Sequence, residues 1–171
     1  MNSPLAGARG SSRAEGFSRA AIALGSNLGD RTAHLDYAVA RLRTLLRAAT
    51  VSSYHETTPV GVPAGEPPQP FYLNAAVVGE TNLPPRDLLD ALLTIERERG
   101  RERPRPNAAR TLDLDLILYG DVVIDEPGLI VPHPRFRDRR FVLEPLAEIG
   151  PDLIDPVTGK SVAELLLSLA G

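Results

Sequence analysis

The segment from residue 110 to residue 121 constrains the fold of this chain more than any other. It reads Arg-Thr-Leu-Asp-Leu-Asp-Leu-Ile-Leu-Tyr-Gly-Asp, with leucine at every second position from 112 to 118, and this alternation predicts a strand with one apolar face. Asp113 and Asp115 then lie together on the opposite face, about 7 Å apart at their Cα atoms because a strand rises about 3.3 Å per residue. Aspartate is uncommon in strands, and like charges on one face repel each other.

The two aspartates therefore predict a cation beside this strand. Mg²⁺ prefers hard oxygen ligands, one or two carboxylates together with phosphate oxygens, so one or two Mg²⁺ ions would satisfy the pair. The spacing alone leaves a second interpretation open, in which the aspartates lie on a solvated strand face and pair with arginines.

The composition indicates a globular protein of ordinary kind. The chain has 171 residues, 43% of them hydrophobic and 24% charged, which is long enough for one domain with a full core. It has no cysteine, which excludes disulfides, thiolate zinc sites and a cysteine nucleophile. No apolar run approaches the length of a membrane span. We therefore expect a cytoplasmic protein that does not bind membranes.

Arginine is concentrated in two segments of this chain. Six of the 18 arginines lie between residues 97 and 110, and four lie between residues 135 and 140. Because the net charge is −3, these clusters indicate a local site for a small polyanion and not a surface for nucleic acid. Arginine forks match phosphate oxygens, and carboxylates with arginines are the groups that phosphoryl transfer uses. For residues 96–103 alone, a solvated helix end with alternating charges is the other interpretation.

The expected elements follow the order β-α-β-β-α-β. Strands are predicted at 19–24, 51–57, 71–81 and 112–118, and helices at 35–46 and from residues 84–85 through Ile95 to an end at Gly100. This order is typical of a ferredoxin-like α+β fold, an antiparallel sheet with both helices on one face. C-terminal additions follow: a short strand near 122–124, a turn at 132–134, an arginine-bearing segment and a helix from about Ser161.

Two segments of biased composition lie outside these elements. Residues 1–18 are rich in Gly, Ser, Ala and Arg, so we expect a disordered tail before a single domain at 19–171. The Arg and Ser content of this tail leaves an organelle-targeting segment open. Residues 58–70 hold five prolines and two glycines, and so long a loop in a compact domain is usually functional.

Three further features are candidates for binding. Asn74 interrupts an apolar strand and shares a face with Tyr72, so its amide could recognise the donor and acceptor edge of a heterocycle; a cross-strand hydrogen bond is the alternative. His133, held between two prolines, could face a phosphate or serve only the turn. The segment 25–29, Gly-Ser-Asn-Leu-Gly, could bind phosphate through backbone amides. It lacks the lysine of a P-loop, so a tight turn is the alternative.

Four sequence blocks in this order resemble one known family. They are residues 23–28, 72–76, 110–115, and 131–134 followed by 139–141. With these blocks the chain resembles the 6-hydroxymethyl-7,8-dihydropterin pyrophosphokinases of folate biosynthesis from about residue 21 to residue 153. The resemblance implies transfer of pyrophosphate from ATP to the hydroxymethyl oxygen of the pterin, which gives AMP and the pterin diphosphate.

The resemblance also implies roles for individual residues. Two Mg²⁺ ions would be held by Asp113 and Asp115. The catalytic residues would be these aspartates with Arg101 and Arg110. Contacts to ATP would come from Glu96, Arg103, Leu116, His133 and Arg139. The pterin pocket would be formed by Thr57, Thr58, Val60, Tyr72, Asn74 and Phe141. The partners would be these small molecules only, and the enzyme would be a monomer.

The chain departs from the family pattern at two places. Some members carry Arg-Trp-Gly-Pro before the third block, whereas residues 106–109 here are Pro-Asn-Ala-Ala and the chain has no tryptophan. Thr58 also stands where proline is common.

Two other functions remain open, a non-catalytic module that binds a small anion and an ATP-using transferase for another heterocycle. Since no strong general base is evident, we expect catalysis by positioning and charge neutralisation.

Overall fold

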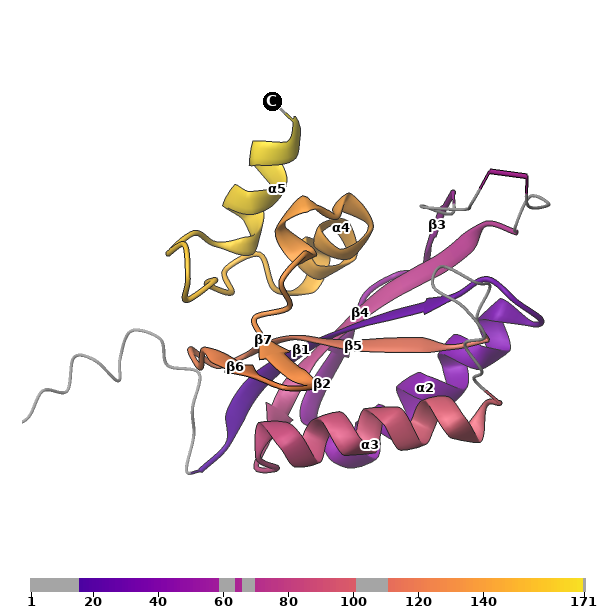
Figure 1. Ribbon diagram of the computed structural model, residues 1–171, viewed down its shortest axis with the longest axis horizontal. Helices are drawn as coiled ribbons and strands as arrows, with labels where there is room; N and C mark the ends of the chain where they lie inside the picture. The colour runs from indigo at the N-terminus through magenta and orange to yellow at the C-terminus, as the bar shows by residue number, and fades with distance from the viewer. Residues whose placement is uncertain (1–15, 59–63, 66–69, 101–110, 171) are drawn as a thin grey trace, which may run out of the picture.

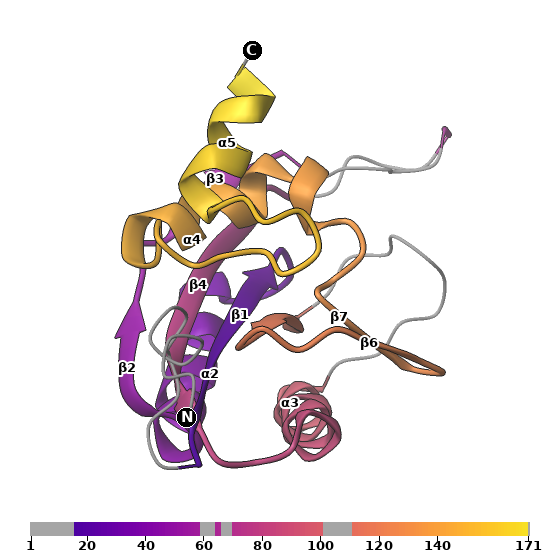
Figure 2. The ribbon, with the colours of Figure 1, turned by 90° about the vertical axis from the view of Figure 1, so that its left-hand side faces the viewer.

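The computed structural model describes residues 16–58, 64–65, 70–100 and 111–170. In this part of the chain a twisted sheet has helices on both faces (Figures 1 and 2). Residues 1–15 of the predicted tail (1–18) and most of the proline-rich loop lie outside the described residues. The strand β1 (Ser18–Ser26) begins one residue before the predicted domain boundary.

The sheet has β1 and β4 (Tyr72–Thr81) at its centre. β5 (Asp113–Tyr119) pairs with the free side of β1, whereas β2 (Arg47–Val51) and β3 (His55–Thr57) both pair with β4. Every one of these pairings is antiparallel. The order β2-β4-β1-β5 confirms the predicted ferredoxin-like α+β arrangement, in which each helical crossover skips one strand.

The helices α2 (Arg31–Leu45) and α3 (Pro85–Glu98) cover one face of the sheet. The Asp30 carboxylate caps α2 by accepting a hydrogen bond from the Ala33 N–H at 3.1 Å, and Pro85 opens α3 as predicted. Leu42 and Leu92, one on each helix, are fully buried against the sheet. This apolar cluster confirms that both predicted helices lie on the same face.

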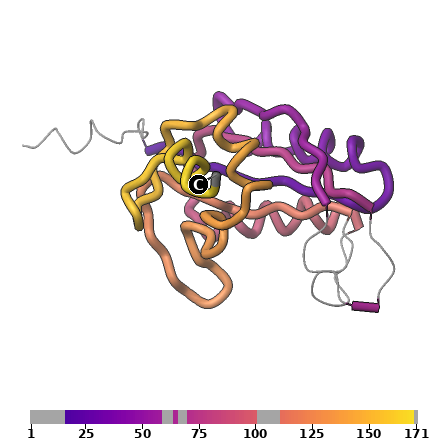
Figure 3. Tube along the Cα trace, turned by 90° about the horizontal axis from the view of Figure 1, so that it is seen from above, coloured from indigo at the N-terminus to yellow at the C-terminus, as the bar shows by residue number. Residues whose placement is uncertain are grey.

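The opposite face is partly covered by α4 (Arg140–Ile149) and α5 (Val162–Ala170). The sequence predicted α5 but only an arginine-bearing segment in place of α4, which contains Pro145. Val142, Leu143 and Leu146 are buried on the sheet, and this packing outweighs the hydrogen bond that proline removes. Seen from above in Figure 3, the end of β1 extends beyond these helices.

A short hairpin and a single 3₁₀ turn connect β5 to α4. The hairpin consists of β6 (Ile124–Glu126) and β7 (Leu129–Val131), and the turn η1 covers Phe136–Asp138. The predicted strand near 122–124 is therefore displaced toward the C-terminus, and its partner β7 was not predicted. Among the described residues no helix is long and apolar enough to span a membrane.

The predicted strand 51–57 is wrong as a single element. The ladder breaks after Val51 and resumes at His55, which separates β2 from β3. At the break, the two hydrogen bonds to Ala76 both come from Ser52. The Ser52 N–H donates to Ala76 O, and the Ser52 hydroxyl accepts from the Ala76 N–H in place of a backbone carbonyl, both at 2.9 Å. A side chain that substitutes for backbone pairing leaves little trace in a hydrophobic pattern.

The predicted face of Leu118 is also wrong. Leu112, Leu114 and Leu116 pack with α2 and α3 as the alternation predicts. The register between β1 and β5 then shifts next to Ile117, and Ile117 and Leu118 both belong to the cluster under α4 and α5. A β-bulge inserts one residue and so reverses the faces beyond it.

Gly79 on β4 provides a test of this packing. A Cβ at this position would lie 2.8 Å from Leu46 Cβ and 3.2 Å from Arg47 O. Because the overlap involves main-chain atoms at the start of β2, we expect Gly79→Ala to lower the free energy of unfolding by about 1–3 kcal/mol. Urea denaturation measures this value. Asn82→Ala, at an exposed position just after β4, is the control, and equal stability of both variants would contradict the packing.

Candidate active site

One row of residues crosses the sheet near the end of β1, where neither α4 nor α5 covers it in the described part of the chain (Figure 3). Asn74 on β4 is the register partner of Gly25 on β1, and Gly25 is in turn the partner of Asp113 on β5. Gly25 has no side chain, and a Cβ there would lie 3.4 Å from Asn74 Oδ1 and 3.5 Å from Tyr72 Cδ1. The backbone of β1 therefore forms a floor between an amide and a carboxylate. Glycine within a strand commonly marks such a close approach.

The next row on the same face contains small residues and the second aspartate. Asp115 is the partner of Ala23, and Ala23 is the partner of Ala76. Since the bulge lies beyond this row, Asp113 and Asp115 share one face, as the alternation predicts, and both are partly exposed. Ala76 is buried in the cluster under α4 and α5, so the two acidic side chains border a floor formed by Gly25 and the partly buried Ala23.

A cavity of about 250 Å³ adjoins Asp115. It lies between α3, β5, the β6–β7 hairpin and the turn after it. Its lining residues are Leu89, Asp115, Leu116, Gly128, Leu129, Ile130, His133 and Pro134. Apolar walls with a few polar groups at one side are typical of small-molecule sites. The carboxylate of Asp115 therefore connects the sheet floor with an apolar cavity.

His133 is held in a fixed orientation at this cavity. Its N–H donates to Ile117 O at 3.0 Å, and its ring nitrogen Nδ1 accepts from the Arg135 N–H at 3.1 Å. The pKa of His133 is lowered to about 4, mainly by burial and also by Arg139 and Arg135, while Asp113 acts in the opposite direction. The imidazole is therefore neutral at pH 7. With Nδ1 accepting, Nε2 carries the proton and is a hydrogen-bond donor without positive charge.

Glu96 lies directly behind the aspartate strand. Its side chain is buried, and its Oε2 accepts a hydrogen bond from the Leu114 N–H at 2.6 Å. Leu114 stands between Asp113 and Asp115, so this bond attaches α3 to the outer edge of β5 at the site itself. Leu116 packs into the apolar cluster under the sheet and also borders the cavity.

The opposite end of the row is formed by β3. Thr57 Oγ1 accepts a hydrogen bond from Asn74 Nδ2 at 2.6 Å, which confirms the cross-strand interpretation for this amide group. The bond also turns Oδ1 of Asn74 toward the floor at Gly25. Thr58, just after β3, is exposed.

Two further predicted site residues lie at the start of α4. Arg139 lies over the half-buried ring of Phe141, with 5.5 Å from Cζ to the ring centroid.

Comparison with known proteins identifies the family. The model of 7,8-dihydro-6-hydroxymethylpterin-pyrophosphokinase (HPPK) matches residues 21–151. The chain belongs to this family. A 2-amino-4-hydroxy-6-hydroxymethyldihydropteridine pyrophosphokinase of Pseudomonas aeruginosa is 43% identical over 86% of this chain and 90% of its own length. The protein of the same name in Bacillus subtilis is 47% identical over 75% of each chain, and that of Synechocystis is 41% identical over 86% of this chain and 74% of its own.

Solved structures of the HPPK fold agree with this assignment. Wild-type HPPK-DHPS of Plasmodium falciparum matches 89% of this chain with a TM-score of 0.67 and 14% sequence identity. The chain spans 44% of the length of that protein. At this level of identity the match supports the fold, and the HPPK family assignment rests on the sequence relatives.

Some predicted HPPK site residues lie outside the described part of the chain, namely Val60, Arg101, Arg103 and Arg110. In the segment 25–29, Gly25 and Ser26 complete β1, and Asn27 is fully buried with its Nδ2 3.3 Å from Pro70 O. This agrees with the tight-turn interpretation. That the backbone at Gly25 forms the floor of the site was not predicted from the sequence. The signal is that Gly25 is the register partner of two polar residues, Asn74 and Asp113.

The protonation of His133 can be tested directly. Its folded-state pKa of about 4 lies below the ordinary value of 6.5, so the unfolded chain takes up a proton first as the pH falls. This lowers the free energy of unfolding as the pH falls from about 6.5 to 4, and the loss is absent above that window. We expect His133→Gln to lose less stability than wild type over this range in thermal unfolding of metal-free protein. An NMR titration of His133 near 6.5 would contradict the assignment.

Proposed function

We propose that the row Asn74–Gly25–Asp113 is the active site of this HPPK. Membership of the family and the named relatives assign the reaction, transfer of pyrophosphate from ATP to 6-hydroxymethyl-7,8-dihydropterin in folate biosynthesis. One observation supports this location above all. An amide able to recognise a heterocycle and a carboxylate able to bind a metal–phosphate group face each other across a backbone floor without a side chain.

Asp113 and Asp115 fit a Mg²⁺ site supplied jointly by protein and substrate. Both offer the hard oxygen donors that Mg²⁺ prefers. Within the described residues no group of three or more His, Cys, Asp or Glu side chains could hold a metal, so phosphate oxygens and water would complete the coordination. Two Mg²⁺ ions bound here would neutralise the triphosphate and favour attack on it.

The remaining residues are assigned by the substrate they would contact. For the pterin we propose Asn74, Tyr72, Thr57, Thr58, Val60 and Phe141. For ATP we propose His133, Arg139, Glu96, Arg103 and Leu116, with Arg101 and Arg110 on the transferred group. The buried Glu96 carboxylate also fixes β5 through the Leu114 N–H, so its contribution is partly structural.

The proposed reaction is an in-line displacement. The hydroxymethyl oxygen bonds to the β-phosphorus of ATP, the bond from that phosphorus to the α,β-bridging oxygen breaks, AMP leaves, and the proton of the acceptor hydroxyl is released to water. With a pKa of about 4, His133 is too weak a base to take the acceptor proton at neutral pH. Its Nε2–H is suited to donate to a phosphate oxygen. Catalysis therefore rests on positioning and charge neutralisation, and covering the substrates would exclude water as a competing acceptor.

We also propose that the enzyme acts as a monomer in the cytoplasm. The proposal is supported by the described residues of the site, which gather at one end of the sheet of a single chain. The cytoplasm supplies ATP and Mg²⁺ together.

The first test is AMP release from ATP and Mg²⁺ with and without 6-hydroxymethyl-7,8-dihydropterin. AMP that appears only with the pterin, together with a pyrophosphorylated pterin, supports the proposal. Saturable nucleotide binding without AMP would favour an anion-binding module. AMP formed only with another heterocycle would favour a transferase of different specificity.

The aspartates should be essential for turnover and dispensable for folding. We expect Asp115→Asn to reduce kcat at least about a hundredfold, because it removes a charged ligand from a site that stabilises phosphoryl charge. The thermal unfolding midpoint should remain near that of wild type, since the carboxylate is partly exposed. Asp121→Asn, at an exposed position just after β5, is the control. A near-normal rate for Asp115→Asn would refute the assignment.

A side chain at Gly25 should weaken binding of the pterin and leave binding of ATP unchanged. A Cβ there would touch Asn74 and Tyr72 at 3.4–3.5 Å, a contact that the fold can accept but that occupies the floor. We expect Gly25→Ala to raise KM for the pterin at least about tenfold while the KM for ATP changes little. Steady-state kinetics with each substrate varied in turn measure both values. An unchanged pterin KM would mean that the heterocycle binds elsewhere.

A further inference from the structure

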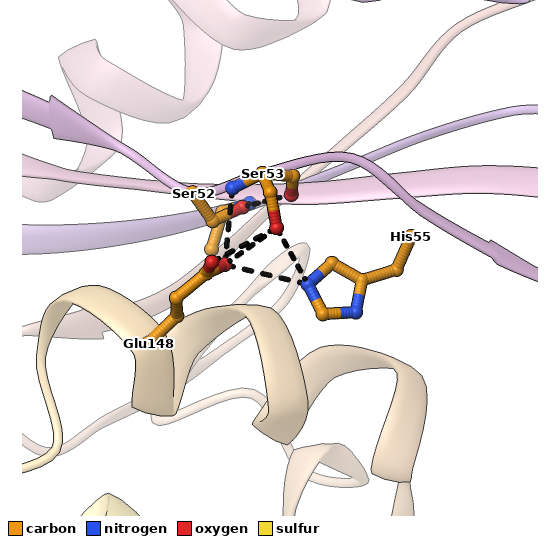
Figure 4. Close-up of polar contacts among 5 residues, drawn as sticks. Ser52, Ser53, His55 and Glu148 are labelled. Atoms are coloured by element: carbon orange, nitrogen blue, oxygen red, sulfur yellow. Dashed lines mark hydrogen bonds and ion pairs between the residues drawn. The ribbon is translucent and has the colours of Figure 1, made fainter.

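A cluster of polar side chains ties α4 to the edge of the sheet outside the residues assigned above (Figure 4). The Glu148 carboxylate accepts hydrogen bonds from both donors of Ser53: the N–H lies 3.0 Å from Oε1, and the hydroxyl, with its single proton, lies 3.0 Å from Oε1 and 2.9 Å from Oε2. His55 Nε2 lies 3.3 Å from Glu148 Oε1 and 3.2 Å from Ser53 Oγ. These bonds hold the pKa of Glu148 below its ordinary value, so the carboxylate is charged at neutral pH.

The cluster differs from a nucleophilic triad in one decisive respect. In such a triad the serine and the carboxylate contact different ring nitrogens, so that the histidine can relay a proton between them. Here Ser53 and Glu148 contact the same nitrogen, Nε2 of His55, and the serine hydroxyl lies against the carboxylate itself. The arrangement is suited to holding the chain in place.

The segment it holds has little ladder support of its own. β3 consists of residues 55–57 at the sheet edge and follows directly after the break at 52–54. A three-residue edge strand is weak by itself. On the α2 side it is tied through Tyr54 OH to Asp36 at 2.6 Å and through Glu56 to Arg31 at 2.8 Å. On the α4 side the Glu148 cluster supplies the tie.

The same strand orients the amide of the proposed pterin site. His55 is the register partner of Asn74, and Thr57 is the partner of Tyr72. Thr57 Oγ1 accepts from Asn74 Nδ2 at 2.6 Å, and this bond determines which end of the amide faces the floor at Gly25. A shift of β3 would therefore move Thr57 and release the amide.

We infer that Glu148 is a positioning residue for the heterocycle, which acts through Ser53, β3 and Thr57 on the Asn74 amide. It does not touch the substrate itself. The inference rests on the proposed function of the Asn74 site. The helix α4, which was not predicted from the sequence, would then contribute to substrate recognition as well as to packing.

The test compares Glu148→Ala and Ser53→Ala with wild type in the pyrophosphokinase assay. We expect Glu148→Ala to raise KM for the pterin about tenfold and to leave KM for ATP within about twofold of wild type. Ser53→Ala keeps its backbone bond to Glu148 and should show a smaller rise in the same direction. Glu148→Gln, which retains one acceptor oxygen, should restore part of the loss. Glu144→Ala is the matched control, a partly exposed α4 residue that pairs within the helix with Arg140 at 3.0 Å.

A double-mutant cycle with Thr57→Val separates positioning from general stability. If Glu148 acts through Thr57, adding Glu148→Ala to Thr57→Val should raise the pterin KM little further. The inference is overturned if the effects of the two substitutions on the pterin KM are fully additive. It is also overturned if folded Glu148→Ala changes both KM values equally or leaves the pterin KM unchanged. If Glu148→Ala does not fold, the pterin KM of Ser53→Ala decides in the same way. Wild type that releases no pterin-dependent AMP would overturn the proposed function and this inference together, whereas active wild type with an unaffected Glu148→Ala overturns only the inference.

Discussion

Asp113 and Asp115 carry like charges side by side on β5, and the register of that strand decides where those charges lie. Leu114 and Leu116 alternate with them into the cluster under α2 and α3, so a slip of one residue would bury both carboxylates. Glu96 reinforces this register by accepting the Leu114 N–H from the outer side of the strand. The apolar core and one buried carboxylate thus keep the acidic pair at the surface, where a cation can approach.

The two faces of the sheet serve different purposes. One is fully committed to packing against α2 and α3, and the other is divided between the α4–α5 cluster and the site. The division is visible in side-chain size, because Ala23 and Gly25 are small at the site, whereas Ala76 and larger residues are buried in the cluster under α4 and α5. The helices above the sheet still contribute to the site indirectly, since α4 holds β3 through Glu148.

Three elements show where pattern reasoning succeeds and fails. The alternation in β5 predicted the shared face of the aspartates, but the bulge at Ile117 reversed the face of Leu118. A bulge depends on how two strands fit together, which one strand does not reveal. The helix α4 was missed; it contains Pro145, and its apolar residues gain more from burial than the lost hydrogen bond costs. The break at 52–54 was invisible because the Ser52 hydroxyl takes over a backbone bond.

The sequence by itself determined the chemistry of this protein: paired aspartates at strand spacing, arginine clusters, and four motif blocks that place the chain among the pyrophosphokinases. These signals are local, because they depend on residue type and short spacing. Only the tertiary structure decided that Gly25 is a floor, that burial keeps His133 neutral, and that Glu148 ties α4 to β3 across 95 residues from Ser53. Each of these depends on contacts between segments far apart in the chain, and no local pattern encodes which distant atoms will meet.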